Sequence, residues 1–97
     1  MTAQDTANSN ALELPQKFDT SACEPVLKEF IARRSEPIVV DASKVEFVTS
    51  QAVALLLSAK RTWDEEGRGF ELNQPSPDFQ KDLKTLGISI DSFVSEA

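Results

Sequence analysis

The chain contains no histidine and only one cysteine, Cys23, among its 97 residues. These scarcities exclude the usual zinc ligand sets, a Ser-His-Asp triad, a Cys-His pair and acid–base catalysis by imidazole. A single cysteine also excludes an internal disulfide. The sequence therefore predicts no metal, no cofactor and no catalytic residue, and carboxylates are left as the remaining route to an enzyme.

Long apolar runs are also missing. No apolar segment approaches the roughly 20 residues that a membrane-spanning helix needs, and the first residues lack the basic region and apolar stretch of a secretory signal. We therefore expect a cytoplasmic protein without direct membrane insertion. The length suits one domain with its own core.

The charge balance is acidic, with 16 acidic and 10 basic side chains and a net charge of −6. Such a surface repels nucleic acid unless a local basic patch intervenes. The basic pairs Arg33-Arg34 and Lys60-Arg61 are too small to form that patch. We expect a protein partner and no nucleic acid.

The N-terminal ten residues are polar and lack apolar periodicity. We expect residues 1–10 to be a disordered leader and residues 11–97 to be the folded domain. Residues 11–14 alternate like a short strand, which Pro15 would confine to an edge or an end of a sheet.

The first helix is marked by Ser21 and Glu24, which have the spacing of a capping box. Arg33-Arg34 suit its C-terminal end, where the helix dipole favours cations. Its predicted apolar stripe consists of Cys23, Val26, Leu27, Phe30 and Ile31. The stripe favours Cys23 as a small core residue over a reactive thiol.

Two strands and a second helix follow. The β-branched run at residues 37–41 predicts a fully buried central strand, and residues 42–44 turn the chain. Residues 45–48 lead into a helix from about Ser50 to about Glu66. Another strand is predicted at residues 69–72.

The third helix is predicted to begin with Ser76 as N-cap and Pro77 at its first position, and to end at Gly87. We expect Phe79, Leu83 and Leu86 on its buried face, followed by a short element made by Ile88, Ile90, Phe93 and Val94. Helices that alternate with strands predict an α/β fold, with a small mixed, mostly parallel sheet and helices packed against it.

The second helix has two distinct sides in projection. Its predicted core side consists of Ala52, Leu55, Leu56, Ala59 and Trp63. A neighbouring flank consists of Ser50, Val53, Ala54, Leu57 and Arg61. Either the first helix covers Val53 and Leu57, or these residues form an apolar patch beside Ser50 that suits a partner.

The central segment, IVVDASKVEFVTSQAV at residues 38–53, resembles the STAS domain family of anti-sigma factor antagonists and their relatives. The family pattern is an apolar strand, Asp-Leu-Ser-Gly-Val, two spacers and Ile-Asp-Ser-Ser-Gly-Leu. Supporting matches are Phe18-Asp19, residues 69–72, the Pro-Ser-Pro opening of the third helix and Leu86-Gly87-Ile88. The resemblance covers roughly residues 11–93.

The resemblance implies a STAS-type domain whose Ser50 is phosphorylated by a cognate kinase that is also its partner. The partner would bind when Ser50 is free and leave when it is phosphorylated, and the kinase would bind the ATP. The sequence departs from the pattern at Thr49, Gln51 and Ala52, which stand for Asp, Ser and Gly, and it lacks the glycine usual shortly before Asp19.

Three functions remain open at this point. The first is a phosphorylation-controlled antagonist of a kinase or anti-sigma factor, acting as a monomer or weak dimer. The second is a constitutive adaptor, in a lipid-transport ABC complex or in a chemotaxis or sensory assembly. Partner-binding candidates for both are Asp19, Ser43, Lys44, Thr49, Ser50, Gln51, Val53, Ala54, Leu57 and Arg61.

The third function is an enzyme in which Asp41 and Asp19 approach each other as an acid–base pair. The alternative for Asp41 is that it ends a strand and organises the following turn. Two alternatives also remain at the second helix: Thr49 or Ser50 is a simple N-cap, or Thr49 caps while Ser50 is exposed.

Overall fold

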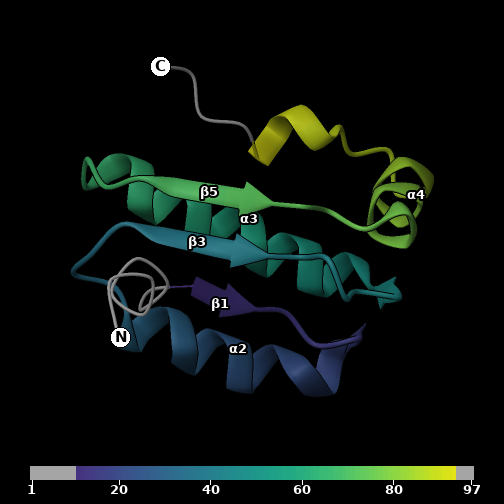
Figure 1. The fold of residues 1–97 in the computed structure, drawn as a ribbon, viewed down its shortest axis with the longest axis horizontal. Coiled ribbons are helices and arrows are strands. Elements are labelled where there is room, and N and C mark those ends of the chain that lie inside the picture. Colours follow the sequence, from purple (N-terminus) through teal and green to yellow (C-terminus); the bar gives the residue numbers. More distant parts are fainter. Residues whose placement is uncertain (1–10, 94–97) are drawn as a thin grey trace, which may run out of the picture.

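The computed structural model of the chain describes residues 11–93. Strands β1 (Ala11–Glu13), β3 (Ile38–Asp41) and β5 (Phe70–Asn73) form a parallel sheet in the order β1-β3-β5 (Figure 1). The predicted α/β class and the edge position of the first strand are confirmed. The expected leader at 1–10 and Val94 lie outside the described residues. None of the described helices is long and apolar enough to span a membrane.

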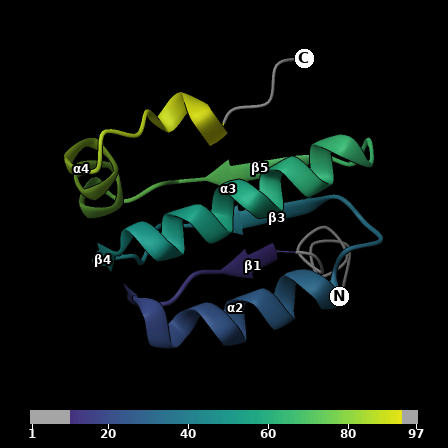
Figure 2. The ribbon, with the colours of Figure 1, turned by 180° about the vertical axis from the view of Figure 1, so that it is seen from behind.

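Helices α2 (Thr20–Ala32) and α3 (Ser50–Glu65) are the crossover connections, and both lie on the same side of the sheet (Figure 2). The alternate strand residues Leu12, Ile38, Val40 and Phe70 are buried on that side. Val39 and Asp41, which point to the other side, are only half-buried. The prediction of a fully buried central strand was therefore wrong, because these helices cover one face of the sheet.

A second, very short sheet was not predicted. Strands β2 (Lys17–Phe18) and β4 (Phe47–Val48) pair in parallel, with Phe18 opposite Val48. Both of these side chains are buried, whereas Phe47 is 47% exposed. Since α2 and α3 begin directly after these two strands, the pairing brings the two helix starts to the same end of the molecule.

The start of α2 differs from the predicted capping box. Asp19 is the N-cap, and its Oδ1 accepts hydrogen bonds from the Ala22 N–H at 3.2 Å and the Ser21 hydroxyl at 2.8 Å. Ser21 therefore lies inside the helix. The hydrogen bond from Ser21, helped by the backbone N–H of Ala22, lowers the pKa of Asp19.

The apolar stripe of α2 is only partly buried. Val26 and Phe30 face the core, but Leu27 is 43% and Ile31 is 62% exposed. The prediction was wrong for these two residues, because the contacts of α2 with α3 and β2 do not cover this part of the stripe. Cys23 is half-buried and packs against the core, as predicted.

The third helix, α4 (Pro77–Thr85), begins as predicted with Ser76 as N-cap and Pro77 in the first turn. Gly87 follows it with a positive φ of 77°, which suits a helix end. Leu86 is 38% exposed, so its predicted burial was wrong. It is the C-cap residue, and the buried face of the helix consists of Phe79 and Leu83. A 3-10 turn, η1 (Ile90–Phe93), packs against α3 and α4.

An aromatic cluster joins the two crossover helices to the sheet. The rings of Phe30, Trp63 and Phe70 have centroids 5.8–6.3 Å apart, a spacing at which aromatic pairs attract. The Trp63 indole N–H donates to the carbonyl oxygen of Glu36 at 2.7 Å. This bond fixes the loop that leaves α2 against the last turns of α3.

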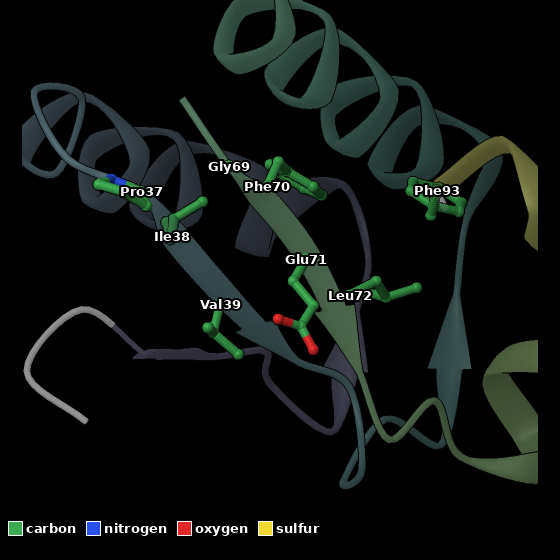
Figure 3. Close-up of a pocket in the computed structure, with 8 residues that line it drawn as sticks. All are labelled: Pro37, Ile38, Val39, Gly69, Phe70, Glu71, Leu72 and Phe93. Atoms are coloured by element: carbon green, nitrogen blue, oxygen red, sulfur yellow. The ribbon is translucent and has the colours of Figure 1, made fainter. Parts of the chain in front are cut away.

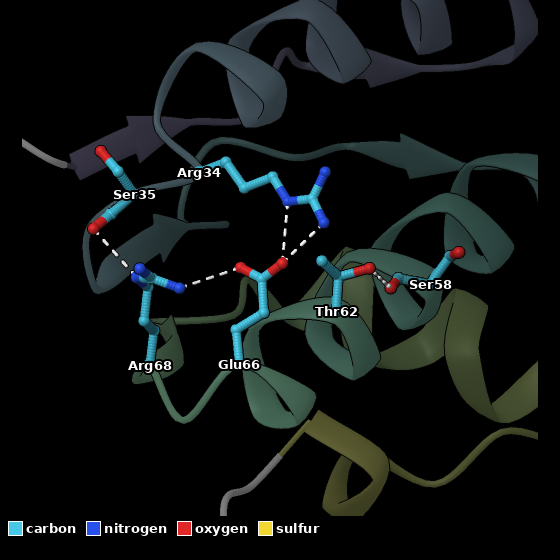
Figure 4. Close-up of polar contacts among 6 residues, drawn as sticks. All are labelled: Arg34, Ser35, Ser58, Thr62, Glu66 and Arg68. Carbon is cyan, nitrogen blue, oxygen red and sulfur yellow. Dashed lines mark hydrogen bonds and ion pairs between the residues drawn. The ribbon is translucent and has the colours of Figure 1, made fainter.

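A polar cluster joins the same two ends at the surface (Figure 4). Glu66 accepts from Arg34 at 2.6 Å and from Arg68 at 3.0 Å, and Arg68 also donates to the Ser35 carbonyl at 2.9 Å. The hydrogen bond from Arg34 lowers the pKa of Glu66. Because these groups are exposed, the cluster orders the two loops more than it stabilises the fold.

We predict that Trp63→Phe lowers the free energy of unfolding by about 1–3 kcal/mol, since the carbonyl of Glu36 loses its donor and the smaller phenyl ring leaves part of the indole's space empty. Urea unfolding measures this change. Thr62→Val is the control, because Thr62 donates only to Ser58 within α3; we expect a change within about 0.5 kcal/mol. Equal stability of the Trp63→Phe and unmodified chains would contradict the role given to this bond.

Candidate functional site

The start of α3 separates the roles of Thr49 and Ser50. Thr49 is the N-cap, and its hydroxyl oxygen accepts the Ala52 N–H at 3.2 Å. Ser50 is the first helical residue and is exposed. Its hydroxyl has no hydrogen bond within residues 11–93. The alternative in which Thr49 caps and Ser50 is exposed is the one observed.

The starts of α2 and α3 are joined directly. The Thr49 N–H donates to the Phe18 carbonyl at 3.2 Å, and the Thr20 hydroxyl donates to Oε1 of Gln51 at 2.7 Å. The first turns of both helices contain no acidic residue. The N-cap of α2 is itself the carboxylate of Asp19, so the positive end of α2 already has a negative charge beside it. The start of α3 has none, and its dipole favours a negative charge at Ser50.

The buried face of α3 is rotated from the predicted one. Val53 and Lys60 are buried, whereas Leu55 is only half-buried. Val53 was a partner-binding candidate, and its complete burial rules out contact with a partner on the surface. Gln51 accepts a hydrogen bond from Thr20, so the side of α3 that carries Gln51 faces α2. Val53 lies on a different side of α3 and is buried in the core rather than covered by the first helix.

The outward face of α3 carries small side chains. Ser50, Ala54 and Ser58 are exposed at helical i, i+4 spacing, with Arg61 beside them and half-buried Leu57 at their flank. We call these five residues the outer face of α3. A second helix can approach closely over such a surface, because small residues leave room for its backbone.

A groove between α2 and α3 continues from this face. It has a volume of about 490 Å³, and Ala54 and Ser58 form part of its wall. Its other lining residues are Thr20, Cys23, Glu24, Leu27, Gln51 and Leu55. Burial raises the pKa of the Cys23 thiol, which keeps it protonated and agrees with a packing role.

Two exposed apolar side chains near this end were not identified from the sequence. Leu27 lines the groove, and Phe47 lies on β4, three residues before Ser50. The exposure of Phe47 has a visible cause, because it alternates with buried Val48. The exposure of Leu27 has no sequence signal, since an apolar stripe on a helix is usually buried.

The remaining candidates are held by local bonds. Oδ1 of Asp41 accepts the Ser43 N–H at 2.9 Å, which confirms that Asp41 organises the turn. Lys44 pairs with Glu13 of β1 at 2.8 Å. Within residues 11–93, neither Ser43 nor Lys44 forms a hydrogen bond or an ion pair with Ser50. Asp19, the other member of the proposed acid–base pair, is the N-cap of α2, and the described residues contain no cluster of metal ligands.

A second hollow, of about 450 Å³, lies beside β3 and β5 (Figure 3). Its lining residues are Pro37, Ile38, Val39, Gly69, Phe70, Glu71, Leu72 and Phe93. Glu71 is the one ionisable residue among them, and none of the predicted site residues is there. The hollow offers no pair of polar groups for chemistry, so the start of α3 is the better candidate site.

Comparison with protein families gives one match: a family model described as "Mlab, STAS domain" matches residues 1–94. Comparisons with curated proteins and with solved structures give no significant match.

The division of roles at the start of α3 is testable by stability alone. We predict that Thr49→Ala lowers the free energy of unfolding by about 1 kcal/mol, because the Ala52 N–H loses its acceptor. Thr49→Asp should retain the wild-type stability, since a carboxylate also caps. Ser50→Ala should change stability by less than about 0.5 kcal/mol. A larger loss in Ser50→Ala than in Thr49→Ala, measured by urea unfolding, would reverse the assignment.

Proposed function

Because the chain belongs to the STAS domain family, we propose that it is a regulatory protein-binding module of the cytoplasm, similar to anti-sigma factor antagonists. Its partner is a kinase or an anti-sigma factor that binds at the start of α3. The observation that carries this proposal is the exposed Ser50 hydroxyl, which is free of the capping role because Thr49 performs it.

The proposed docking surface consists of the outer face of α3 and the adjoining groove. Ala54 and Ser58 line the groove on one side of α3 and a smaller hollow with Leu57 and Arg61 on the other. Partly exposed Leu27 and Leu55 supply apolar area. A partner helix placed along this surface would bury that area and would cover Ser50 at one end.

Phosphorylation of Ser50 is the proposed control. A phosphate adds about −1.5 to −2 charge at neutral pH, and the positive end of α3 would stabilise it without unfolding that helix. The Asp19 carboxylate at the start of α2 opposes part of this effect. The same charge at the rim of an apolar groove disfavours a docked partner, because the phosphate would have to lose its water. The partner kinase would supply ATP.

A constitutive adaptor is the second proposal. Thr49 stands where the family pattern has an aspartate, so the acceptor hydroxyl lacks an adjacent carboxylate at the cap. In this case the same surface would bind a subunit of a lipid-transport ABC complex, or of a chemotaxis or sensory assembly, without modification.

One experiment distinguishes the two proposals. The full chain is incubated with extract of its native cells and ATP, and phosphate is located by mass spectrometry. We expect phosphate on Ser50, its loss in Ser50→Ala, and weaker partner capture by the phosphorylated form. Stable capture without modification, equal in Ser50→Ala, would contradict the switch and favour the adaptor.

The docking surface has its own test. Leu57→Asp is unsuitable, because Leu57 packs against the core and a charge there would cost stability. Ala54 is exposed, so we expect Ala54→Arg to reduce capture of the partner at least about tenfold with a stability change within about 0.5 kcal/mol.

The matched control is Ala32→Arg, at an exposed alanine at the other end of α2. It should leave capture unchanged. Undiminished capture by Ala54→Arg, measured beside this control by pull-down and thermal unfolding, would contradict the proposed surface.

A further inference from the structure

Helix α4 holds the segment that leads to Ser50, although it lies outside the proposed docking surface. The N-cap residue Ser76 donates its N–H to the Ala42 carbonyl at 3.1 Å and its hydroxyl to the Val45 carbonyl at 2.5 Å. The same hydroxyl accepts the Phe79 N–H at 3.0 Å. Ser76 is buried, so the start of α4 is fixed to the chain between β3 and β4.

The third attachment is at β4 itself. Oδ2 of Asp82 on α4 accepts the Val48 N–H at 3.0 Å. The neighbouring N–H groups of Phe47 and Thr49 point the opposite way and donate to Gln16 and Phe18. Strand β4 is therefore paired with β2 along one edge and held by a carboxylate along the other.

The position of Asp82 within α4 indicates that its role is to accept the hydrogen bond from Val48 rather than to stabilise its own helix. It lies in the second half of the nine-residue helix, where the helix dipole disfavours an anion. Asp78, in the first turn, is the acidic residue that suits the dipole. The half-buried carboxylate of Asp82 thus gains little from its own helix and gains a charge-assisted hydrogen bond from Val48.

We infer that Asp82 is a positioning residue for the Ser50 site. The hydrogen bond from the Val48 N–H to Asp82 fixes the position of the backbone just before the N-cap Thr49. It thereby fixes the position of Ser50, the first residue of α3. The importance of Asp82 for partner binding rests on the proposed function. The hydrogen bond by which Asp82 fixes β4 does not depend on that proposal.

Amide hydrogen exchange measured by NMR tests this inference. In the unmodified chain, the Val48 amide should be protected although none of the strands within residues 11–93 pairs with that edge of β4. In Asp82→Ala, exchange at Val48 should rise about tenfold or more relative to Trp63, and the amide signals of Thr49 and Ser50 should shift. Loop-like exchange at Val48 in the unmodified chain would overturn the inference.

Two further variants separate positioning from general stability. Asp82→Asn keeps an oxygen acceptor and should restore protection at Val48 and the signals of Ser50. Asp78→Ala removes an exposed carboxylate of the same helix and should leave both unchanged. If Asp82→Asn behaves like Asp82→Ala, or Asp78→Ala shifts Ser50 equally, the assignment fails. The Ala54→Arg test judges the docking surface separately.

Discussion

The parallel pairing of β2 with β4 is the constraint on which the site depends. It is only two residues long, yet it places Phe18 opposite Val48 and carries the hydrogen bond from Thr49 to the Phe18 carbonyl. The N-caps Asp19 and Thr49 each follow directly after one of these paired strands, so α2 and α3 begin side by side. This alignment allows the hydrogen bond between Thr20 and Gln51 to form. The groove between the helices and the two aligned dipoles are consequences of this register.

The two ends of the helix pair differ in how their groups are used. At the C-terminal ends, Trp63 and the cluster of Arg34, Glu66 and Arg68 satisfy one another and the neighbouring loops. At the N-terminal ends, the Ser50 hydroxyl and partly exposed Leu27 have no such role in the described fold. An exposed hydroxyl and exposed apolar area beside the Thr20–Gln51 hydrogen bond suit the N-terminal ends to bind a partner.

Much of this arrangement follows from local sequence rules. The cap at Ser76 and the helix end at Gly87 depend on neighbours close in the chain and were predicted. The cap at Thr49 and the turn at Asp41 were each one of the alternatives that the sequence left open. Long-range contacts were not: the β2–β4 pair is too short for a pattern, and Asp82 meets Val48 across 34 positions. The cap at Asp19 was missed because Ser21 and Glu24 have the spacing of a capping box nearby. The sequence left Val53 open between burial and an exposed patch, because it lies on the flank of the helix rather than at the centre of the predicted core side.

The central claim is that the outer face of α3 binds the partner. Site-specific photo-crosslinking in native cells tests it most directly, with the crosslinker placed at position 54 on this face or at position 71 on the open side of the sheet. The account predicts one discrete crosslinked protein from position 54 and none from position 71. A crosslinked partner from position 71, with none from position 54, would contradict it.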